Sequence, residues 1–155
     1  MMIFTDGSFS KKPNVGGAGY IILSQNHEIT GGRYLFNCSD NNVAEVFAIY
    51  SALKFIEKHN FKDKTIQIIS DSDYALRKIN LNKEGRNEME SIFLKYIQEF
   101  QQKTNKKISF MLVKGHKHDK TKISFYNNLA DEIAREQRLL GIERYKQTIK
   151  NKYRD

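Results

Sequence analysis

The sequence predicts an α/β (α+β) domain with a five-stranded mixed sheet, antiparallel over its first three strands and parallel over the later ones, flanked by helices. Three strand-like segments follow one another within residues 2–36, and neighbours of this kind form antiparallel hairpins. Helical and strand-like segments then alternate, which is typical of parallel strands joined by crossovers. No repeat, low-complexity tract or Pro/Gly/Ser-rich linker interrupts this order, so we expect a single domain.

The first three strands are predicted at residues 2–5, 18–25 and 27–36. The first strand ends in the stretch IFTDGSF, where a short apolar run meets Asp6 and Gly7. Because Asp-Gly is a favoured turn pair, the simplest interpretation is a strand that stops at Asp6 and then turns. The alternative is that Asp6 is a functional carboxylate, and the choice depends on the other acids of the chain.

The remaining elements follow from the period of the apolar residues. Helical spacing predicts a helix over residues 42–59, in which alanines at every fourth position form a small face suited to close packing on a sheet. The apolar run TIQIIS predicts a buried strand at 65–70, and ISFMLVK predicts the fifth strand at 108–114. Further helices are predicted at 72–79, 87–102 and 127–140.

Charge and composition limit the kind of partner. The 155 residues carry a net charge of +8 and have a pI near 9.5, which favours a polyanion such as nucleic acid. Lysines and arginines are dense in residues 114–122 and 144–154, with aromatic residues close to both segments. We therefore expect a domain at 1–141 followed by a basic C-terminal tail at 142–155.

Cysteine content and hydropathy limit the compartment. Cys38 is the single cysteine, which excludes an internal disulfide framework and a Cys-rich zinc site and favours a reducing environment. No apolar run approaches the roughly 20 residues of a membrane span. We expect a soluble, cytoplasmic monomer that does not bind membranes.

Four carboxylates stand where a sheet edge and helix starts can meet. Asp6 ends the first predicted strand and Asp71 follows the fourth, so parallel pairing of these strands would bring both to one edge of the sheet. Glu45 lies in the first turn of the helix predicted at 42–59, and Asp131 lies near the start of the last helix. Each of these two acids can reach that edge of the sheet if its helix begins above the edge.

Each acid also has an ordinary structural interpretation. Asn42 and Glu45 have the spacing of a capping box, Asp71 stands where a helix N-cap is expected, and Asp131 with Arg135 has the spacing of an ion pair. Together, however, four carboxylates at one edge would repel one another by several kcal/mol in a partly buried site. Divalent cations remove this repulsion. Oxygen ligands without cysteine favour Mg²⁺ or Mn²⁺, and two such ions about 4 Å apart serve in-line displacement at phosphorus.

Five motifs occur in order along the chain, namely TDGS at 5–8, NNVAE at 41–45, SDS at 70–72, VKGH at 113–116 and NNLAD at 127–131. With this set the sequence resembles the type 1 ribonuclease H family over essentially all of the chain up to about residue 140. The resemblance implies a ribonuclease H-like fold and a ribonuclease H enzyme that hydrolyses the RNA strand of RNA/DNA hybrids. It also implies two Mg²⁺ ions, with Mn²⁺ as a substitute, and products with 5′-phosphate and 3′-hydroxyl ends.

The resemblance further implies roles for individual residues. Asp6, Glu45, Asp71 and Asp131 match the metal-ligand positions of the family, and His116 matches a loop histidine that assists proton transfer or product release. The backbone after Asp6 would approach the 2′-hydroxyls that distinguish RNA from DNA. The implied substrate contacts are Gly7, Ser8, Asn41, Asn42, Lys114 and Asn127.

Three features depart from the family pattern. The loop before Asp131 is longer than usual and carries a second histidine, His118, as an alternative to His116. Residues 72–107 have room for one short and one long helix, without the additional helix and basic loop that grip substrate in many members, so we expect lysines of the loop or the tail to compensate. Asp40 stands where members often have a hydroxyl residue that helps to hold a DNA phosphate.

Two other functions fit parts of this pattern. A non-catalytic RNA/DNA-hybrid-binding domain would keep the fold, but four unused acids would be costly to fold without metal. A DNA-cutting integrase or resolvase shares the metal chemistry on the same fold, and fold alone does not separate it from a ribonuclease. The combination of TDGS, NNVAE and VKGH favours the ribonuclease.

Overall fold

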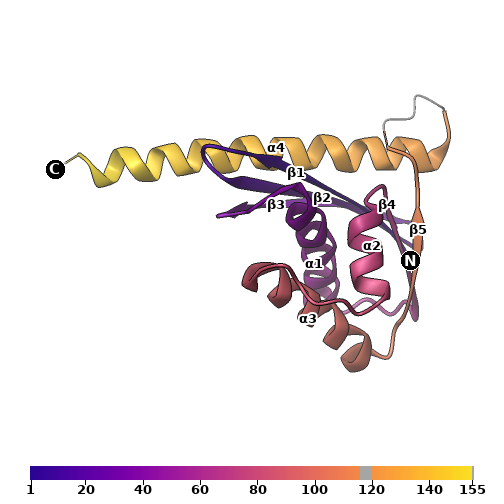
Figure 1. The fold of residues 1–155 in the computed structure, drawn as a ribbon. Coiled ribbons are helices and arrows are strands. Elements are labelled where there is room, and N and C mark those ends of the chain that lie inside the picture. Colours follow the sequence, from indigo (N-terminus) through magenta and orange to yellow (C-terminus); the bar gives the residue numbers. More distant parts are fainter. Residues whose placement is uncertain (116–119, 155) are drawn as a thin grey trace.

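A five-stranded mixed sheet forms the centre of the molecule, as the sequence predicts (Figure 1). The computed structural model describes residues 1–115 and 120–154. The strands are β1 (Met2–Ser10), β2 (Val15–Ser24), β3 (His27–Phe36), β4 (Thr65–Ser70) and β5 (Lys107–Leu112). Their order across the sheet is β3-β2-β1-β4-β5, with antiparallel pairing among the first three and parallel pairing of β4 with β1 and β5. The parallel pair β1/β4 is the arrangement on which the shared sheet edge depends.

Helices cover both faces of the sheet. They are α1 (Asn41–His59), α2 (Asp73–Asn80), α3 (Glu88–Thr104) and α4 (Lys122–Lys152). The first three lie on one face, and α4 runs across the other (Figure 1). Each face has its own buried apolar cluster, the larger around Phe47 and Leu53 of α1 and the smaller around Phe4, Ile21 and Ala130. Within the described residues, no helix is both long enough and apolar enough to cross a membrane.

Strand β1 continues through the Asp-Gly pair, so the turn predicted at Asp6 is wrong. Asp6 pairs with Gly19 of β2, and the antiparallel ladder runs on to Ser10. The parallel pairing of β1 with β4, in contrast, ends at Phe4. Asp6 therefore lies where β4 stops, and beyond it β1 has one edge that β4 does not cover. This free edge is where a functional site can form.

The predicted capping box at the start of α1 is also wrong. The helix begins at Asn41, and its N-cap is Asp40, whose side chain accepts a hydrogen bond from the Val43 N–H at 3.0 Å. Glu45 is therefore not used as a capping residue. At the start of α2, Ser72 accepts the capping hydrogen bond from Ala75, so Asp71 is not used there either.

Two strands have the predicted bounds, and the last helix differs most. The strands at 27–36 and 65–70 are as predicted, and residues 72–107 hold one short and one long helix. The helix predicted at 127–140 instead occupies Lys122–Lys152, so the predicted tail is helical almost to its end. Gly141 does not end the helix, because it lies against β2 and β3, where an added Cβ would be 2.7 Å from the Val15 side chain.

Helix α4 approaches the sheet closely because glycines of β2 face it. A Cβ added at Gly19 would lie 2.2 Å from the carbonyl oxygen of Ala130, and one at Gly17 would meet α4 in the same way. Glycine is the residue that allows two backbones to come this near. Gly19 is the ladder partner of Asp6, and Asp131 directly follows Ala130. This packing therefore brings Asp131 next to Asp6 from the face of the sheet opposite to α1.

Candidate active site

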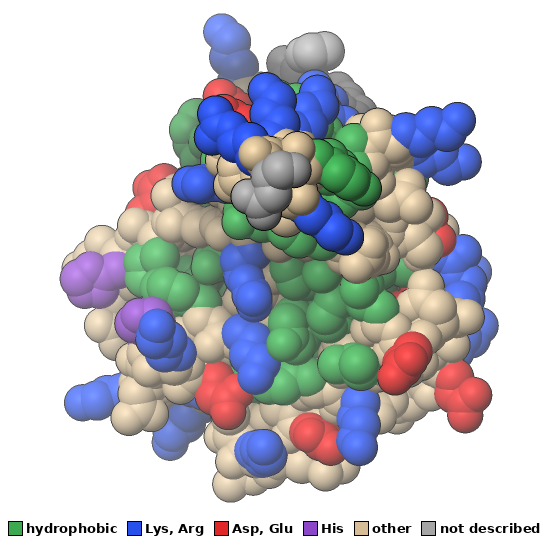
Figure 2. Space-filling model, turned by 90° about the vertical axis from the view of Figure 1, so that its left-hand side faces the viewer, with side chains coloured by type: hydrophobic (Ala, Val, Ile, Leu, Met, Phe, Trp, Pro, Cys, Tyr) green, Lys and Arg blue, Asp and Glu red, His purple; other side chains and the backbone are tan. Residues whose placement is uncertain are grey.

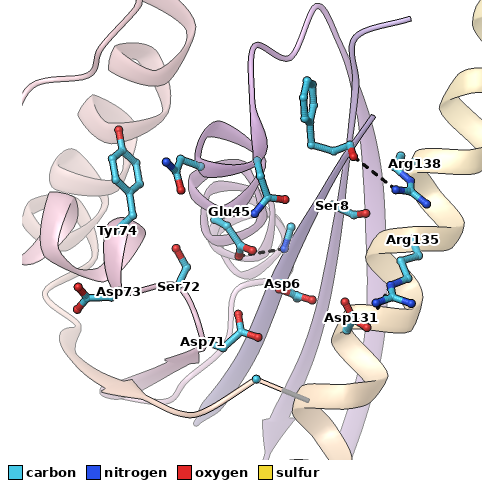
Figure 3. A pocket seen from close by; sticks show the side chains of 15 residues that line it. Asp6, Ser8, Glu45, Asp71, Ser72, Asp73, Tyr74, Asp131, Arg135 and Arg138 are labelled. Atoms are coloured by element: carbon cyan, nitrogen blue, oxygen red, sulfur yellow. Dashed lines mark hydrogen bonds and ion pairs between the residues drawn. The ribbon is translucent and has the colours of Figure 1, made fainter. Parts of the chain in front are cut away.

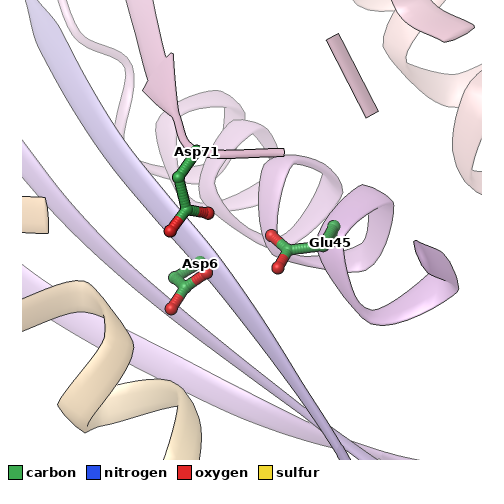
Figure 4. Close-up of side chains that lie close together, drawn as sticks. All are labelled: Asp6, Glu45 and Asp71. Carbon is green, nitrogen blue, oxygen red and sulfur yellow. The ribbon is translucent and has the colours of Figure 1, made fainter. Parts of the chain in front are cut away.

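Three of the predicted metal ligands meet at the sheet edge where β4 ends (Figure 4). Asp6 comes from β1, Glu45 from the start of α1, and Asp71 from the residue directly after β4. Each contributes a carboxylate oxygen, and these three oxygens lie within 4.8 Å of one another. Asp6 and Glu45 are buried, and Asp71 is partly exposed. The parallel pairing of β1 and β4 thus brings the acids together as expected.

Glu45 is held toward this cluster by Gly7. The Gly7 N–H donates a hydrogen bond of 3.0 Å to Glu45 Oε2 at the free edge of β1. A Cβ at Gly7 would lie 2.4 Å from the backbone of Ala44 and Glu45, so only glycine lets α1 pack this closely on β1. Gly7 is therefore not a turn residue. It determines the distance between the helix and the strand that carry two of the acids.

Asp131 approaches the cluster from α4. Its carboxylate lies close enough to that of Asp6 to raise the pKa of Asp6, and it forms an ion pair of 3.2 Å with Arg135 one turn later. The predicted ion pair with Arg135 is confirmed, whereas the role of Asp131 as a metal ligand stays a prediction. Asp131 lies beside the three-carboxylate group rather than within it.

The carboxylates of the cluster repel one another. Burial raises the pKa of Asp6, and the neighbouring Glu45 raises it further. Burial likewise raises the pKa of Glu45, with the charge of Asp71 as the next cause. The cluster therefore retains protons that isolated carboxylates would lose, and a bound cation would displace them.

The donor set suits a hard divalent cation. All of its ligand atoms are carboxylate oxygens, which Mg²⁺ and Mn²⁺ prefer, whereas zinc sites usually include cysteine or histidine. Cys38 is buried in the core under α1 and takes no part. Asp6, Glu45 and Asp71 can hold such an ion, with Asp131 next to them.

The acids line an open cavity of about 890 Å³. One wall is formed by α1 and α2 and the opposite wall by α4, with the free edge of β1 between them (Figure 3). Four of the six predicted substrate contacts also line it, namely Gly7, Ser8, Asn41 and Asn42. The cavity is thus bordered by groups that can bind metal, phosphate or hydroxyl.

Other predicted site residues lie elsewhere. Lys114 and Asn127 line a separate cavity of about 390 Å³ beside the start of α4, and Asn127 is buried there. His116 and His118 fall outside the described residues, so their predicted role stays a prediction. The end of the long loop, residues 122–126, forms the first turn of α4.

The sequence reasoning missed Arg138 as a cavity residue. Its Nη1 donates to the Phe9 carbonyl oxygen at 3.4 Å, and its Nε is buried without a hydrogen-bond partner (Figure 3). A guanidinium with unused donors in a cavity lined by acids can receive an anion such as a phosphate. The signal was present in the sequence, because Arg135 and Arg138 follow Asp131 by about one and two helical turns.

Asp40, which departs from the family pattern, is neutralised by a partner far away in the sequence. Arg86 Nη2 lies 2.8 and 2.7 Å from the two carboxylate oxygens of Asp40. Burial acts to raise the pKa of Asp40, but the hydrogen bonds from the Val43 N–H and from Arg86 outweigh it and lower the pKa. The acid at this position thus forms an ion pair that connects α1 to the segment before α3.

Gly115 lies against Asp71 and leaves room for the Asp71 carboxylate. A Cβ at this position would lie 2.5 Å from Asp71 Oδ2, which is the mobile end of a side chain rather than backbone. Gly115→Ala is therefore expected to displace the Asp71 carboxylate and to lower the cleavage rate about tenfold to a hundredfold. Urea unfolding should change by less than about 1 kcal/mol. An unchanged rate, or a large loss of stability, would show that the carboxylate does not yield in this way.

The chain matches a model of a known protein family. A model of the RNase H family matches residues 1–138, which include the three acids of the cluster and Asp131. Among curated proteins there is no significant match.

Solved structures with the same fold include RNase H1 proteins. LC11-RNase H1, isolated from compost by a metagenomic approach, has a TM-score of 0.70 and 20% identity, covering 91% of this chain and 96% of the other. RNase H1 from the halophilic archaeon Halobacterium salinarum NRC-1 has a TM-score of 0.68 and 19% identity, covering 88% and 95%. LC11-RNase H1 in complex with an RNA/DNA hybrid has a TM-score of 0.72 and 19% identity, covering 91% and 98%. At these identities the likeness establishes the fold.

Proposed function

Since the match covers residues 1–138, the chain belongs to the RNase H family, and from this premise we propose that it hydrolyses the RNA strand of RNA/DNA hybrids by a two-metal mechanism. The family membership confirms the predicted enzyme class, a ribonuclease H. The observation that carries the proposal is the group of three carboxylates, with oxygens within 4.8 Å, on the floor of an open cavity.

The residues of the cavity have different roles in this proposal. Asp6, Glu45 and Asp71 hold the metal ions, and Asp131 contributes from α4. When bound, two Mg²⁺ ions would activate the attacking water and stabilise the leaving 3′-oxygen, which yields 5′-phosphate and 3′-hydroxyl ends. Gly7 keeps Glu45 turned toward the cluster through its N–H. Arg138 lines the same cavity, and the guanidinium N–H groups that its bond to Phe9 leaves available can donate to a backbone phosphate of the substrate.

Selection of RNA would come from the free edge of β1 and the start of α1. Ser8, Asn41 and Asn42 line the cavity beside the acids, and their side chains carry the donors and acceptors that a 2′-hydroxyl needs. The net charge of +8 favours a polyanion. A related fold, that of LC11-RNase H1, has been solved with an RNA/DNA hybrid, which supports the same substrate class here.

A panel of four labelled duplexes tests the proposal. We expect Mg²⁺- or Mn²⁺-dependent cleavage of an RNA/DNA hybrid, and no comparable cleavage of RNA/RNA or DNA/DNA, because both a 2′-hydroxyl strand and a DNA-like strand are needed. Cleavage of a DNA duplex that carries a single ribonucleotide shows whether one 2′-hydroxyl is sufficient for recognition. Binding of the hybrid without cleavage under any divalent ion would favour the non-catalytic domain, and cleavage of DNA/DNA would favour the DNA-cutting relative.

A further inference from the structure

The C-terminal part of α4 extends beyond the body of the protein (Figure 1). The helix packs on β2 and β3 as far as Gly141, which contacts Val15 and Tyr34. The ring of Tyr145, with its centroid 6.0 Å from that of Phe36, makes one more contact with β3. Residues 143–154 are all exposed. We call residues 142–154 the arm, and an exposed helical arm gains little stability from the rest of the chain.

The arm is strongly basic. Figure 2, which views the molecule from the end where α4 projects, shows Lys and Arg side chains gathered around the projecting helix. Between residues 142 and 154, Glu143 is the single acid. The basic residues are Arg144, Lys146, Lys150, Lys152 and Arg154. This charge complements a polyanion and would repel a basic protein.

One side of the arm continues a wall of the catalytic cavity. Arg135 and Arg138 of α4 line that cavity. Lys146 follows Arg135 by about three helical turns, and Tyr145 follows Arg138 by about two, so both lie on the side of α4 that faces the cavity. Arg144 follows Arg135 by about two and a half turns and lies on the opposite side.

We propose that this side of the arm is a second binding surface for the nucleic-acid duplex whose cleavage is proposed above, an inference that rests on that function. Lys146 binds a backbone phosphate, and the contact between Tyr145 and Phe36 holds the arm in line with the cavity. At 1.5 Å per residue, Lys146 lies about 16 Å from Arg135, or about five base pairs along a duplex. The arm thus adds affinity away from the scissile phosphate without touching the acids.

Two charge reversals on opposite sides of the arm test the proposal. Lys146→Glu and Arg144→Glu change the charge equally and lie at nearly the same height on the helix. In an Asp71→Asn background, which binds without cutting, Lys146→Glu is expected to weaken binding of a 20-base-pair hybrid about tenfold and to lower the slope of log K against log salt by about 1 to 2. Arg144→Glu should change the affinity for the same hybrid by no more than about twofold, because Arg144 lies on the side of the arm that faces away from the duplex.

The outcomes separate this inference from the proposed function. If the unmodified protein cleaves the hybrid but the two reversals weaken binding equally, the arm acts only through its net charge, and the assigned surface is wrong. If the unmodified protein cleaves no hybrid, the proposed function itself fails. A concentration-dependent dimer in sedimentation that Ile149→Asp disperses, together with unchanged hybrid binding by Lys146→Glu, would assign the arm to a second copy of the chain instead.

Discussion

Asp71→Asn is expected to lower the rate of hybrid cleavage on the order of 10³-fold or more while the fold stays intact. The Asp71 carboxylate is one of the three whose oxygens lie within 4.8 Å of one another. Asparagine keeps the size of the side chain but removes the negative charge that holds a divalent cation. Single-turnover rates at saturating Mg²⁺, with circular dichroism to verify the fold, measure the effect.

Stability measurements on the same variant test the electrostatic explanation. In EDTA, Asp71→Asn is expected to be at least as stable as the parent, because the Asp71 charge contributes to the raised pKa of Glu45 and its removal relieves repulsion. Mn²⁺ should raise the Tm of the parent by mass action and should raise that of the variant much less. A variant that loses stability in EDTA would contradict this explanation.

Asp73→Asn is the matched control. Asp73 lines the same cavity two residues away, but it forms an ion pair with Arg77 and lies outside the carboxylate group. Its replacement should change the cleavage rate by no more than a few fold, since Asp73 is not among the carboxylates that could hold a metal ion. Equal losses in the Asp71 and Asp73 variants would mean that general negative charge, and not a metal site, supports cleavage.

Gly7→Ala is expected to destabilise the protein by at least about 2 kcal/mol, in contrast to Gly115→Ala. The new Cβ would lie 2.4 Å from backbone atoms of Ala44 and Glu45, and a backbone cannot move aside as a side chain can. Helix α1 would have to shift away from β1, which also lengthens the hydrogen bond between the Gly7 N–H and Glu45. Urea unfolding gives the free energy, and the m value shows whether the native state has loosened.

Ser8→Ala serves as the control for Gly7→Ala, because it introduces no new atoms at the adjacent position of the same strand. Successive side chains of a strand point to opposite faces, so residue 8 does not face α1 as residue 7 does. Its expected effect on the free energy of unfolding is below about 1 kcal/mol. Comparable stability of all three proteins would show that α1 does not pack on β1 as closely as the structure indicates.

The local sequence pattern was sufficient to predict the bounds of those elements that depend mainly on their own residues. The strands at 27–36 and 65–70 could be predicted to the residue. The second of them is a β-branched, apolar run bounded by polar segments. The parallel pairing of β1 with β4 followed from the alternation of helix and strand. The reach of α4 to Lys152 could not be predicted, because a glycine usually marks a helix end and Gly141 does not do so here.

The sequence by itself determined which chemical groups are available to the candidate site. It contains the carboxylates, their order along the chain, the single cysteine Cys38 and the basic charge, and these favour hard cations and a polyanionic partner. They do so because ligand preference is a property of the residue types present. The same residues carry the resemblance to the RNase H family.

Only the tertiary structure decided which acids serve the site and how closely they meet. The sequence allowed Glu45 to be a capping residue and Asp6 to begin a turn. The ladder between β1 and β2 excludes the turn, and the packing of α1 against Gly7 turns Glu45 toward Asp6. These outcomes depend on the distance between layers that are far apart in the chain. Contacts across the sheet set that distance, and the local sequence pattern does not record it.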